Sequence, residues 1–189
     1  MKTLIKNGLL IDPANQVQAY LNLILEDGKV VAVTEEEPEA DRVIDATGKV
    51  VAPGFIDIHM HEDPVKDGKI EFCIFDAMLR MGVTTAVGGN CGINVYDPVK
   101  YLDMVEKDGA PVNVMLFAGH QYFREAAGAL DKYAPVTKEQ QEHMKKGLEK
   151  ALEAGCVGIS YGLRYVPGTG RDEFLDTASC CEKEHRMIS

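Results

Sequence analysis

The amino-acid sequence predicts an α/β protein in which a small β-sheet region precedes a parallel sheet covered by helices. Two observations support this. Short apolar runs separated by turn residues fill the first fifty positions, and from residue 53 onward a strand, a loop and a helix follow one another four times. Strands that alternate with helices form parallel sheets, because each helix returns the chain to the start of the next strand. We therefore expect two domains, at residues 1–52 and 53–189.

Two turn signals organise the N-terminal region. Asn7-Gly8 and Asp27-Gly28 each lie between short apolar runs. Asn, Asp and Gly tolerate the positive φ angles of tight hairpin turns. We expect a β-hairpin at each pair, and Pro53-Gly54 ends the β region.

The second part of the chain carries four β-α units. Strands are predicted at residues 55–59, 83–87, 112–117 and 156–160. Asp97 before Pro98 is typical of a helix start, with an N-cap followed by proline at the first helical position. Thr137 and Gln140 have the spacing of a capping box. The last helix is expected to carry Phe174, Leu175 and Ala178.

Composition excludes several classes of partner. The formal net charge is −10 and the sequence pI is about 5.0, which disfavours binding to nucleic acid or to an anionic membrane surface. No apolar run approaches the roughly 18 residues of a membrane-spanning helix. The five cysteines are odd in number and lack paired spacing, so we expect reduced thiols and a cytoplasmic protein.

Polar residues follow the first predicted strand. Asp57, His59 and His61 alternate with apolar residues, so they share one face of an extended segment. The strand rise places the two histidines roughly 6–7 Å apart at Cα, from where both imidazoles can converge on one metal ion. Asp57 and Asp63 could accept hydrogen bonds that orient the imidazole rings. Two ordinary loop histidines are the alternative interpretation.

Cys91 follows the second predicted strand, between Gly89 and Gly92. A thiolate is a good zinc ligand. A small buried residue is the commoner fate of a cysteine without a disulfide, and a nucleophile activated by a nearby histidine is a third possibility. His120 and Arg124 follow the third strand, and Tyr165 follows the fourth. A polar group suited to a ligand therefore follows every strand.

With these residues assembled, the chain resembles the N-terminal part of an amidohydrolase-superfamily enzyme, and within it the N-acyl-D-amino-acid deacylase (D-aminoacylase) family. The superfamily motif spans residues 51–61, VAPGFIDIHMH. The narrower family is suggested by residues 89–92 (GNCG), by Gly119-His120 with Arg124, and by residues 158–167. The resemblance extends over essentially the whole chain, including the β region.

This resemblance implies a fold and a site. Residues 53–189 would form the first half of a TIM-type metal-dependent hydrolase barrel, and residues 1–52 would belong to a composite β-sandwich. One or two Zn²⁺ ions would be held by His59, His61 and Cys91, with the cysteine in place of the carboxylated lysine of many relatives. Tyr165 would help to hold the substrate carboxylate, and His120 and Arg124 would line the pocket.

The implied reaction is hydrolysis of the amide bond of an N-acyl-D-amino acid, a small-molecule substrate. Two further histidine ligands and the aspartate that acts as general acid/base come, in this family, from strands five, six and eight. We expect these strands beyond residue 189, so that residues 1–189 contain no catalytic acid/base. The chain would then be a truncated form with an incomplete active site.

Two other functions remain open at this stage. A cyclic-amide hydrolase of the dihydroorotase or hydantoinase kind would typically carry a carboxylated lysine on the fourth strand, and residues 156–165 contain no lysine. A non-catalytic half-barrel would leave open sheet edges and uncovered apolar faces, which favour self-association.

Overall fold

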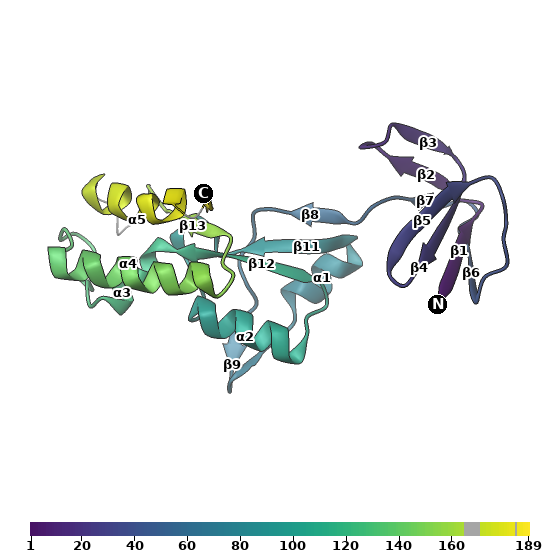
Figure 1. The fold of residues 1–189 in the computed structure, drawn as a ribbon. Helices are drawn as coiled ribbons and strands as arrows, with labels where there is room; N and C mark the ends of the chain where they lie inside the picture. Colours follow the sequence, from purple (N-terminus) through teal and green to yellow (C-terminus); the bar gives the residue numbers. More distant parts are fainter. Residues whose placement is uncertain (165–170, 184) are drawn as a thin grey trace. The chain divides into compact units, whose positions relative to one another are not determined.

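The structure is a computed structural model that describes residues 1–164, 171–183 and 185–189 (Figure 1). The chain divides into two compact units, Met1–Gly54 and Phe55–Ser189. The first unit is built of strands alone, and the second contains every helix that the structure describes.

The first unit contains two small sheets. One has four strands in the order β5 (Lys29–Thr34), β4 (Asn22–Glu26), β1 (Lys2–Lys6) and β6 (Arg42–Asp45). The other has three strands in the order β3 (Val17–Tyr20), β2 (Leu9–Asp12) and β7 (Val50–Val51). Leu4 on β1, Ile24 on β4 and Leu10 on β2 are buried, so each of the two sheets has buried apolar side chains.

The two turn signals of this unit have different outcomes. Asp27-Gly28 joins the antiparallel strands β4 and β5, as predicted. The hairpin predicted at Asn7-Gly8 is wrong, because β1 pairs with β4 and β6 while β2 pairs with β3 and β7. Asn7 has the expected positive φ of 65°, but the turn carries the chain from one sheet to the other. Both edges of β1 are already occupied by more distant strands.

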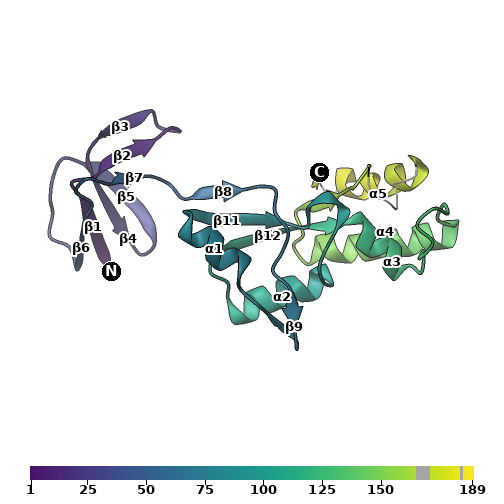
Figure 2. The same cartoon turned by 180° about the vertical axis from the view of Figure 1, so that it is seen from behind.

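The second unit is organised around a parallel sheet of five strands (Figures 1 and 2). Their order is β14 (Met187–Ile188), β13 (Gly158–Ser160), β12 (Asn113–Gly119), β11 (Val83–Gly88) and β8 (Phe55–Asp57). Every neighbouring pair is parallel. The fold is that of the first half of an α/β barrel, as the sequence analysis predicted.

The sheet has one strand more than expected. The sequence analysis predicted four strands and placed the fifth beyond the chain, yet β14 pairs with β13. The Met187 amide donates to the Val157 carbonyl at 3.0 Å, and the Ser189 amide donates to the Ile159 carbonyl at 2.9 Å. A two-residue strand has too little sequence for a periodic pattern, and the backbone pairing alone defines it.

Five α-helices surround the sheet in the described part of the chain: α1 (Ile74–Arg80), α2 (Pro98–Asp108), α3 (His120–Ala126), α4 (Lys138–Glu153) and α5 (Arg171–Lys183). A 3₁₀ turn, η1 (Asn90–Gly92), follows β11, and a small hairpin, β9 (Val65–Lys66) and β10 (Lys69–Ile70), precedes α1. Helices α1, α2 and α4 pack on β11 and β12. Phe75, Leu116, Leu148 and Ile159 are fully buried in the resulting core.

Local signals placed two helix starts correctly. The Asp97 carboxylate accepts hydrogen bonds from the amides of Val99 and Lys100, and Pro98 is the first helical residue. Thr137 and Gln140 form the predicted capping box at α4. Helix α3 was not predicted; it begins at His120, directly after β12. None of the described helices combines the length and apolar character that a bilayer-crossing segment needs.

Candidate functional site

The carboxyl ends of the parallel strands bring the predicted site residues to one edge of the second unit. His59 lies two residues beyond β8, Cys91 lies in η1 after β11, and His120 opens α3 after β12. The first strand is shorter than expected and ends at Asp57. His59 and His61 therefore stand in the segment after β8 rather than on its face.

Cys91 and His59 lie next to each other. The Cys91 sulfur is 3.4 Å from His59 Nε2, across 32 positions of sequence. Bond lengths of about 2.3 Å for Zn–S and 2.0–2.1 Å for Zn–N, at a tetrahedral angle, place the two ligand atoms of one zinc ion about 3.6 Å apart. The pair therefore fits zinc in both ligand type and spacing. The same distance suits the thiol–imidazole contact of an activated cysteine nucleophile.

The backbone around Cys91 is unusual. Cys91 adopts the left-handed conformation with φ 60° and ψ 20°, which costs a non-glycine residue about 1–2 kcal/mol. Gly89 and Gly92 on either side also have positive φ, and a Cβ atom added to Gly89 would lie 2.1 Å from the Phe117 carbonyl oxygen. Because the two glycines have no side chain, the turn can lie in close contact with the neighbouring strands. This close packing directs the thiol toward His59.

His61 does not complete a metal site in this structure. Its side chain is exposed, and within the described ranges no group of three or more histidine, cysteine, aspartate or glutamate side chains is placed to hold one metal ion. A catalytic zinc normally has three protein ligands. The structure thus brings together two of the three predicted ligands, and the ligand role of His61 stays a prediction.

The two aspartates predicted to orient the histidines have different surroundings. Asp57 accepts a hydrogen bond from the backbone amide of His59 at 3.0 Å, so it does hold this segment. Asp63 is fully buried and accepts from the amides of Cys73, Ile74 and Phe75 at 2.7–3.0 Å. This carboxylate caps the start of α1, where the helix dipole favours a negative charge, and so the structure gives it a capping role in place of the expected bond to a histidine.

Glu62, between His61 and Asp63, was missed by the sequence analysis. Its side chain is 3% exposed, and it accepts a hydrogen bond from the Asn94 amide group at 2.7 Å. Burial raises the pKa of this carboxyl. Asn94 also donates to the Phe117 carbonyl and accepts from the Gly119 amide. Glu62 and Asn94 together connect the segment after β8 with the end of β12.

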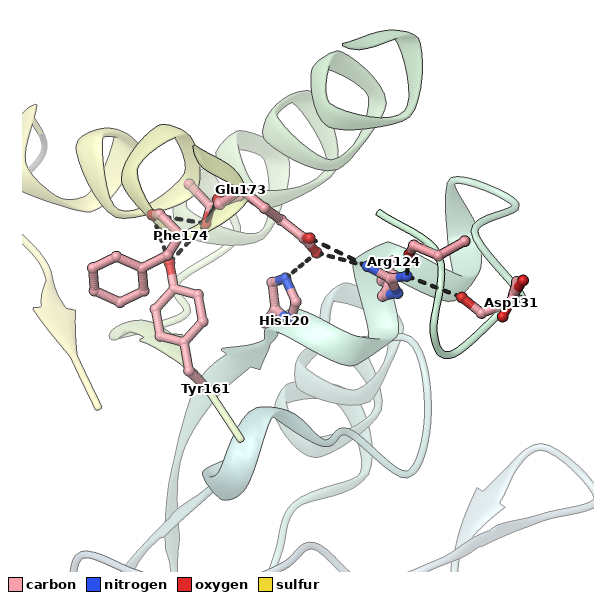
Figure 3. Close-up of polar contacts among 8 residues, drawn as sticks. His120, Arg124, Asp131, Tyr161, Glu173 and Phe174 are labelled. Carbon is pink, nitrogen blue, oxygen red and sulfur yellow. Dashed lines mark hydrogen bonds and ion pairs between the residues drawn. The ribbon is translucent and has the colours of Figure 1, made fainter. Parts of the chain in front are cut away.

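His120 and Arg124 take part in a buried charged cluster (Figure 3). His120 Nε2 lies 2.5 Å from Glu173 Oε1, and Arg124 Nη1 donates to both Glu173 oxygens at 3.2 Å. Arg124 Nη2 donates to the carbonyls of Asp131 and Ala134. The three side chains are 2–3% exposed. We call His120, Arg124 and Glu173 the buried cluster.

Electrostatics of the buried cluster favour an ionised glutamate. Burial alone would raise the pKa of Glu173, but the hydrogen bond from His120 and the positive charges of His120 and Arg124 outweigh it and lower the pKa. The Arg124 guanidinium is directed at Glu173 and at the loop before α4 and is not presented to solvent. A role of His120 and Arg124 in substrate binding stays a prediction.

The sequence analysis did not single out Glu173, although a signal for it exists. Glu173, Thr177 and Cys181 follow one another at helical spacing, and all three are buried on α5. A charged residue on the apolar face of a helix indicates a buried ionic partner, but it does not say which. Tyr165, predicted to hold the substrate carboxylate, lies outside the described residues.

With the site described, the family can be assigned. Residues 42–164 match the amidohydrolase family, and the chain belongs to this family. Among curated proteins it is similar to the N-acyl-D-glutamate deacylase of Alcaligenes xylosoxydans xylosoxydans, with 32% identity over 187 residues that include 87% of this chain and 38% of the relative. The chain thus spans about two fifths of that relative's length.

Two further similarities are informative. The crystal structure of N-acyl-D-glutamate deacylase from Bordetella bronchiseptica, complexed with zinc and a phosphonate inhibitor, superposes with a TM-score of 0.84 at 30% identity, over 98% of this chain and 44% of that one. A dihydroorotase of Elusimicrobium minutum is 42% identical over 88 residues, which are 45% of this chain and 20% of the relative. The deacylases therefore match along far more of the chain.

Proposed function

We propose that this chain carries the first half of the active site of a zinc-dependent amidohydrolase that hydrolyses the linear amide bond of N-acyl-D-amino acids. The contact between Cys91 and His59 is the observation that carries the proposal, because it pairs a thiol with an imidazole at the spacing that zinc requires. The deacylase relatives support the reaction and the substrate class.

The residues of this chain have distinct roles in the proposal. His59, Cys91 and His61 hold the zinc, and Asp57 holds the backbone of His59. When bound, zinc lowers the pKa of a coordinated water to about 7 and polarises the scissile carbonyl. His120, Arg124 and Tyr165 belong to the substrate pocket. We expect the general acid/base from outside these 189 residues; the chain spans 38% of the N-acyl-D-glutamate deacylase to which it is similar.

A cyclic-amide hydrolase is the alternative within the same family. The dihydroorotase similarity supports it. Two features favour the deacylase: Cys91 stands beside His59, and residues 156–164 after α4 contain no lysine that could become the carboxylated bridging ligand expected of cyclic-amide hydrolases.

We also place the protein in the cytoplasm, because no disulfide joins any of its five cysteines, all of which lie in described segments.

Zinc binding by the purified chain tests the proposal. We expect the metal-stripped chain to take up zinc and, with cobalt as a probe, to develop a thiolate-to-cobalt charge-transfer band. Cys91→Ser should abolish the band and weaken zinc binding. Cys73→Ser is the matched control, because that exposed thiol contacts Asp63 and not a histidine, and it should leave the band unchanged.

The outcome that contradicts the metal site is equal zinc content in the parent chain and in a variant with His59→Ala, His61→Ala and Cys91→Ala. Residues 1–189 alone should show no turnover of N-acetyl-D-amino acids. Robust turnover by this chain would show that the described site suffices without further ligands or a further base.

A second role, association of half-barrels, is favoured by a specific surface. Strand β8 pairs only with β11 among the described strands, and Phe55, Ile56 and Ile58 at this edge are 64–71% exposed. An unpaired strand with apolar side chains promotes edge-to-edge association. We propose that a second copy of the chain covers this edge.

The oligomeric state tests this second role. The parent chain should be dimeric or larger by light scattering after gel filtration, and Ile56→Thr with Ile58→Thr should shift it toward the monomer. Leu130→Thr, at an equally exposed leucine in the loop after α3, should not. A parent chain that is monomeric at high concentration would contradict the proposed association.

A further inference from the structure

The turn that carries Cys91 is held by three polar side chains that are not metal-ligand candidates. Asn90 is 1% exposed and Ser160 is fully buried, and Asn94 is half-buried. Asn90 links the turn to the end of β11 and to the segment after β8, Asn94 links it to the end of β12, and Ser160 contacts it from β13. We call Asn90, Asn94 and Ser160 the Cys91 clamp.

Asn90 links Cys91 to the backbone on both sides of His59. Its side-chain nitrogen donates to the Val87 carbonyl at 2.7 Å and lies 3.3 and 3.4 Å from the carbonyls of Met60 and Ile58. Ile58 and Met60 are the residues that flank His59. One amide group, on the residue next to Cys91, therefore contacts the backbone carbonyls of the two residues that flank His59.

Burial of the Asn90 side chain carries an energetic cost. Its side-chain oxygen is buried and has no hydrogen-bond partner among the described residues. An unsatisfied buried acceptor is costly. Only the donor half of the amide is used, and its three acceptors come from the end of β11 and from the segment that bears His59.

Ser160 and Asn94 hold the turn from the opposite side. The Ser160 hydroxyl donates to the Gly89 carbonyl and accepts from the Gly92 amide at 3.0 Å, so it brackets Cys91 from β13. Asn94 anchors the residues after η1 to the Phe117 carbonyl and the Gly119 amide. The left-handed backbone of Cys91 is thus stabilised by bonds to three neighbouring strands or their ends.

We propose that Asn90 is a positioning residue that sets the distance between the Cys91 thiol and the His59 imidazole, so that metal affinity depends on a side chain that does not touch the metal. Ser160 supports the same geometry from the other side of the turn. The inference rests on the proposed zinc site for its metal readout, but the positioning itself is a property of the chain without metal.

The first test is metal binding. Asn90→Ala should bind zinc and cobalt about tenfold or more weakly, in line with the cost of removing groups that orient metal ligands. At saturating cobalt it should still develop the thiolate charge-transfer band, which Cys91→Ser cannot. Asn113→Ala is the matched control: Asn113 also donates its side-chain amide to a strand carbonyl, that of Thr84, but at the start of β12, and its loss should leave affinity unchanged.

The second test needs no metal. In the parent chain, Cys91→Ser should shift the imidazole NMR resonances of His59, assigned with His59→Gln, because sulfur and ring are in contact. In the Asn90→Ala background the same substitution should shift them much less. Parent-like metal affinity together with a parent-like shift would overturn the proposal. If Asn90→Ala fails to fold, Ser160→Ala decides by the same two measurements.

The two tests separate this inference from the proposed function. A parent chain that binds neither zinc nor cobalt removes the metal site, and the NMR coupling alone then decides whether Asn90 positions Cys91 against His59.

Discussion

The Cys91 turn and the buried cluster lie at the same ends of the parallel strands, yet they satisfy their polar groups in different ways. In the buried cluster, Glu173 is matched by His120 and Arg124, and all three side chains are inside the protein. At the Cys91 turn the buried polar groups hold the backbone, while the thiol is half-buried and its partner His59 is exposed. In the first arrangement the polar side chains pair with one another inside the protein, whereas in the second an exposed imidazole faces a half-buried thiol.

This difference explains why similar sequence positions have different uses. Each group follows a parallel strand, where α/β barrels place their active sites. The difference comes from a later helix. Helix α5 places the Glu173 carboxylate beside His120 and Arg124, which follow β12, and the carboxylate pairs with both side chains (Figure 3). In the described ranges, Cys91 and His59 do not belong to any group of three or more histidine, cysteine, aspartate or glutamate side chains that could hold a metal ion.

The largest expected effect comes from breaking the buried cluster. Glu173→Ala would leave the Arg124 charge buried without its carboxylate, and loss of one partner of a buried ion pair typically costs about 3–5 kcal/mol. Urea unfolding at neutral pH should show this loss. Glu142→Ala, which removes the exposed partner of Lys145, should change the free energy of unfolding little. If both substitutions lowered the free energy of unfolding equally, burial would not be what distinguishes the two ion pairs.

A smaller effect is expected at the glycine before the Cys91 turn. Gly89→Ala adds a Cβ that meets the Phe117 carbonyl oxygen at 2.1 Å, in addition to the strain of a φ of 73°. Gly128 has a φ of 77° but no atom within 4 Å of such a Cβ, so Gly128→Ala should cost only the backbone strain, about 1–2 kcal/mol.

Urea unfolding and zinc titration of both glycine variants measure this contrast. Gly89→Ala should be the less stable of the two and should also lose zinc affinity, while Gly128→Ala should keep it. A Gly89→Ala chain that binds zinc like the parent would mean that the close approach of the turn to β12 does not set the ligand geometry.

The smallest expected effect is the pH dependence of the buried cluster. The pKa of Glu173 is lowered in the folded chain from its usual value of 4.5. The stability that this shift contributes is present above about pH 4.5 and is lost as the pH falls through the lower folded pKa. The difference in unfolding free energy between the parent and Glu173→Gln should therefore shrink in acid. A difference that stays constant from neutral pH into acid would argue against an ionised Glu173.

Much of the fold could be predicted from local patterns. The starts of α2 and α4 were correct because a cap depends on residues two or three positions apart, as for Thr137 and Gln140. The hairpin at Asn7-Gly8 and the absence of a fifth strand were wrong for the opposite reason. Strand partners are chosen by distant segments, and a turn signal such as Asn7-Gly8 permits a reversal without specifying which strands it joins.

The candidate site shows the same division. The sequence by itself determined which chemical groups stand at the strand ends: imidazoles at His59 and His120, a thiol at Cys91 and a guanidinium at Arg124. Tertiary structure alone decided that Cys91 meets His59 across 32 positions, that Asp63 caps α1, and that Glu173 reaches Arg124 across 49 positions. Residue type and spacing set what a side chain can do. Which groups share one environment depends on the order of the strands and on how the helices cover them, and these emerge only when the whole sheet is packed.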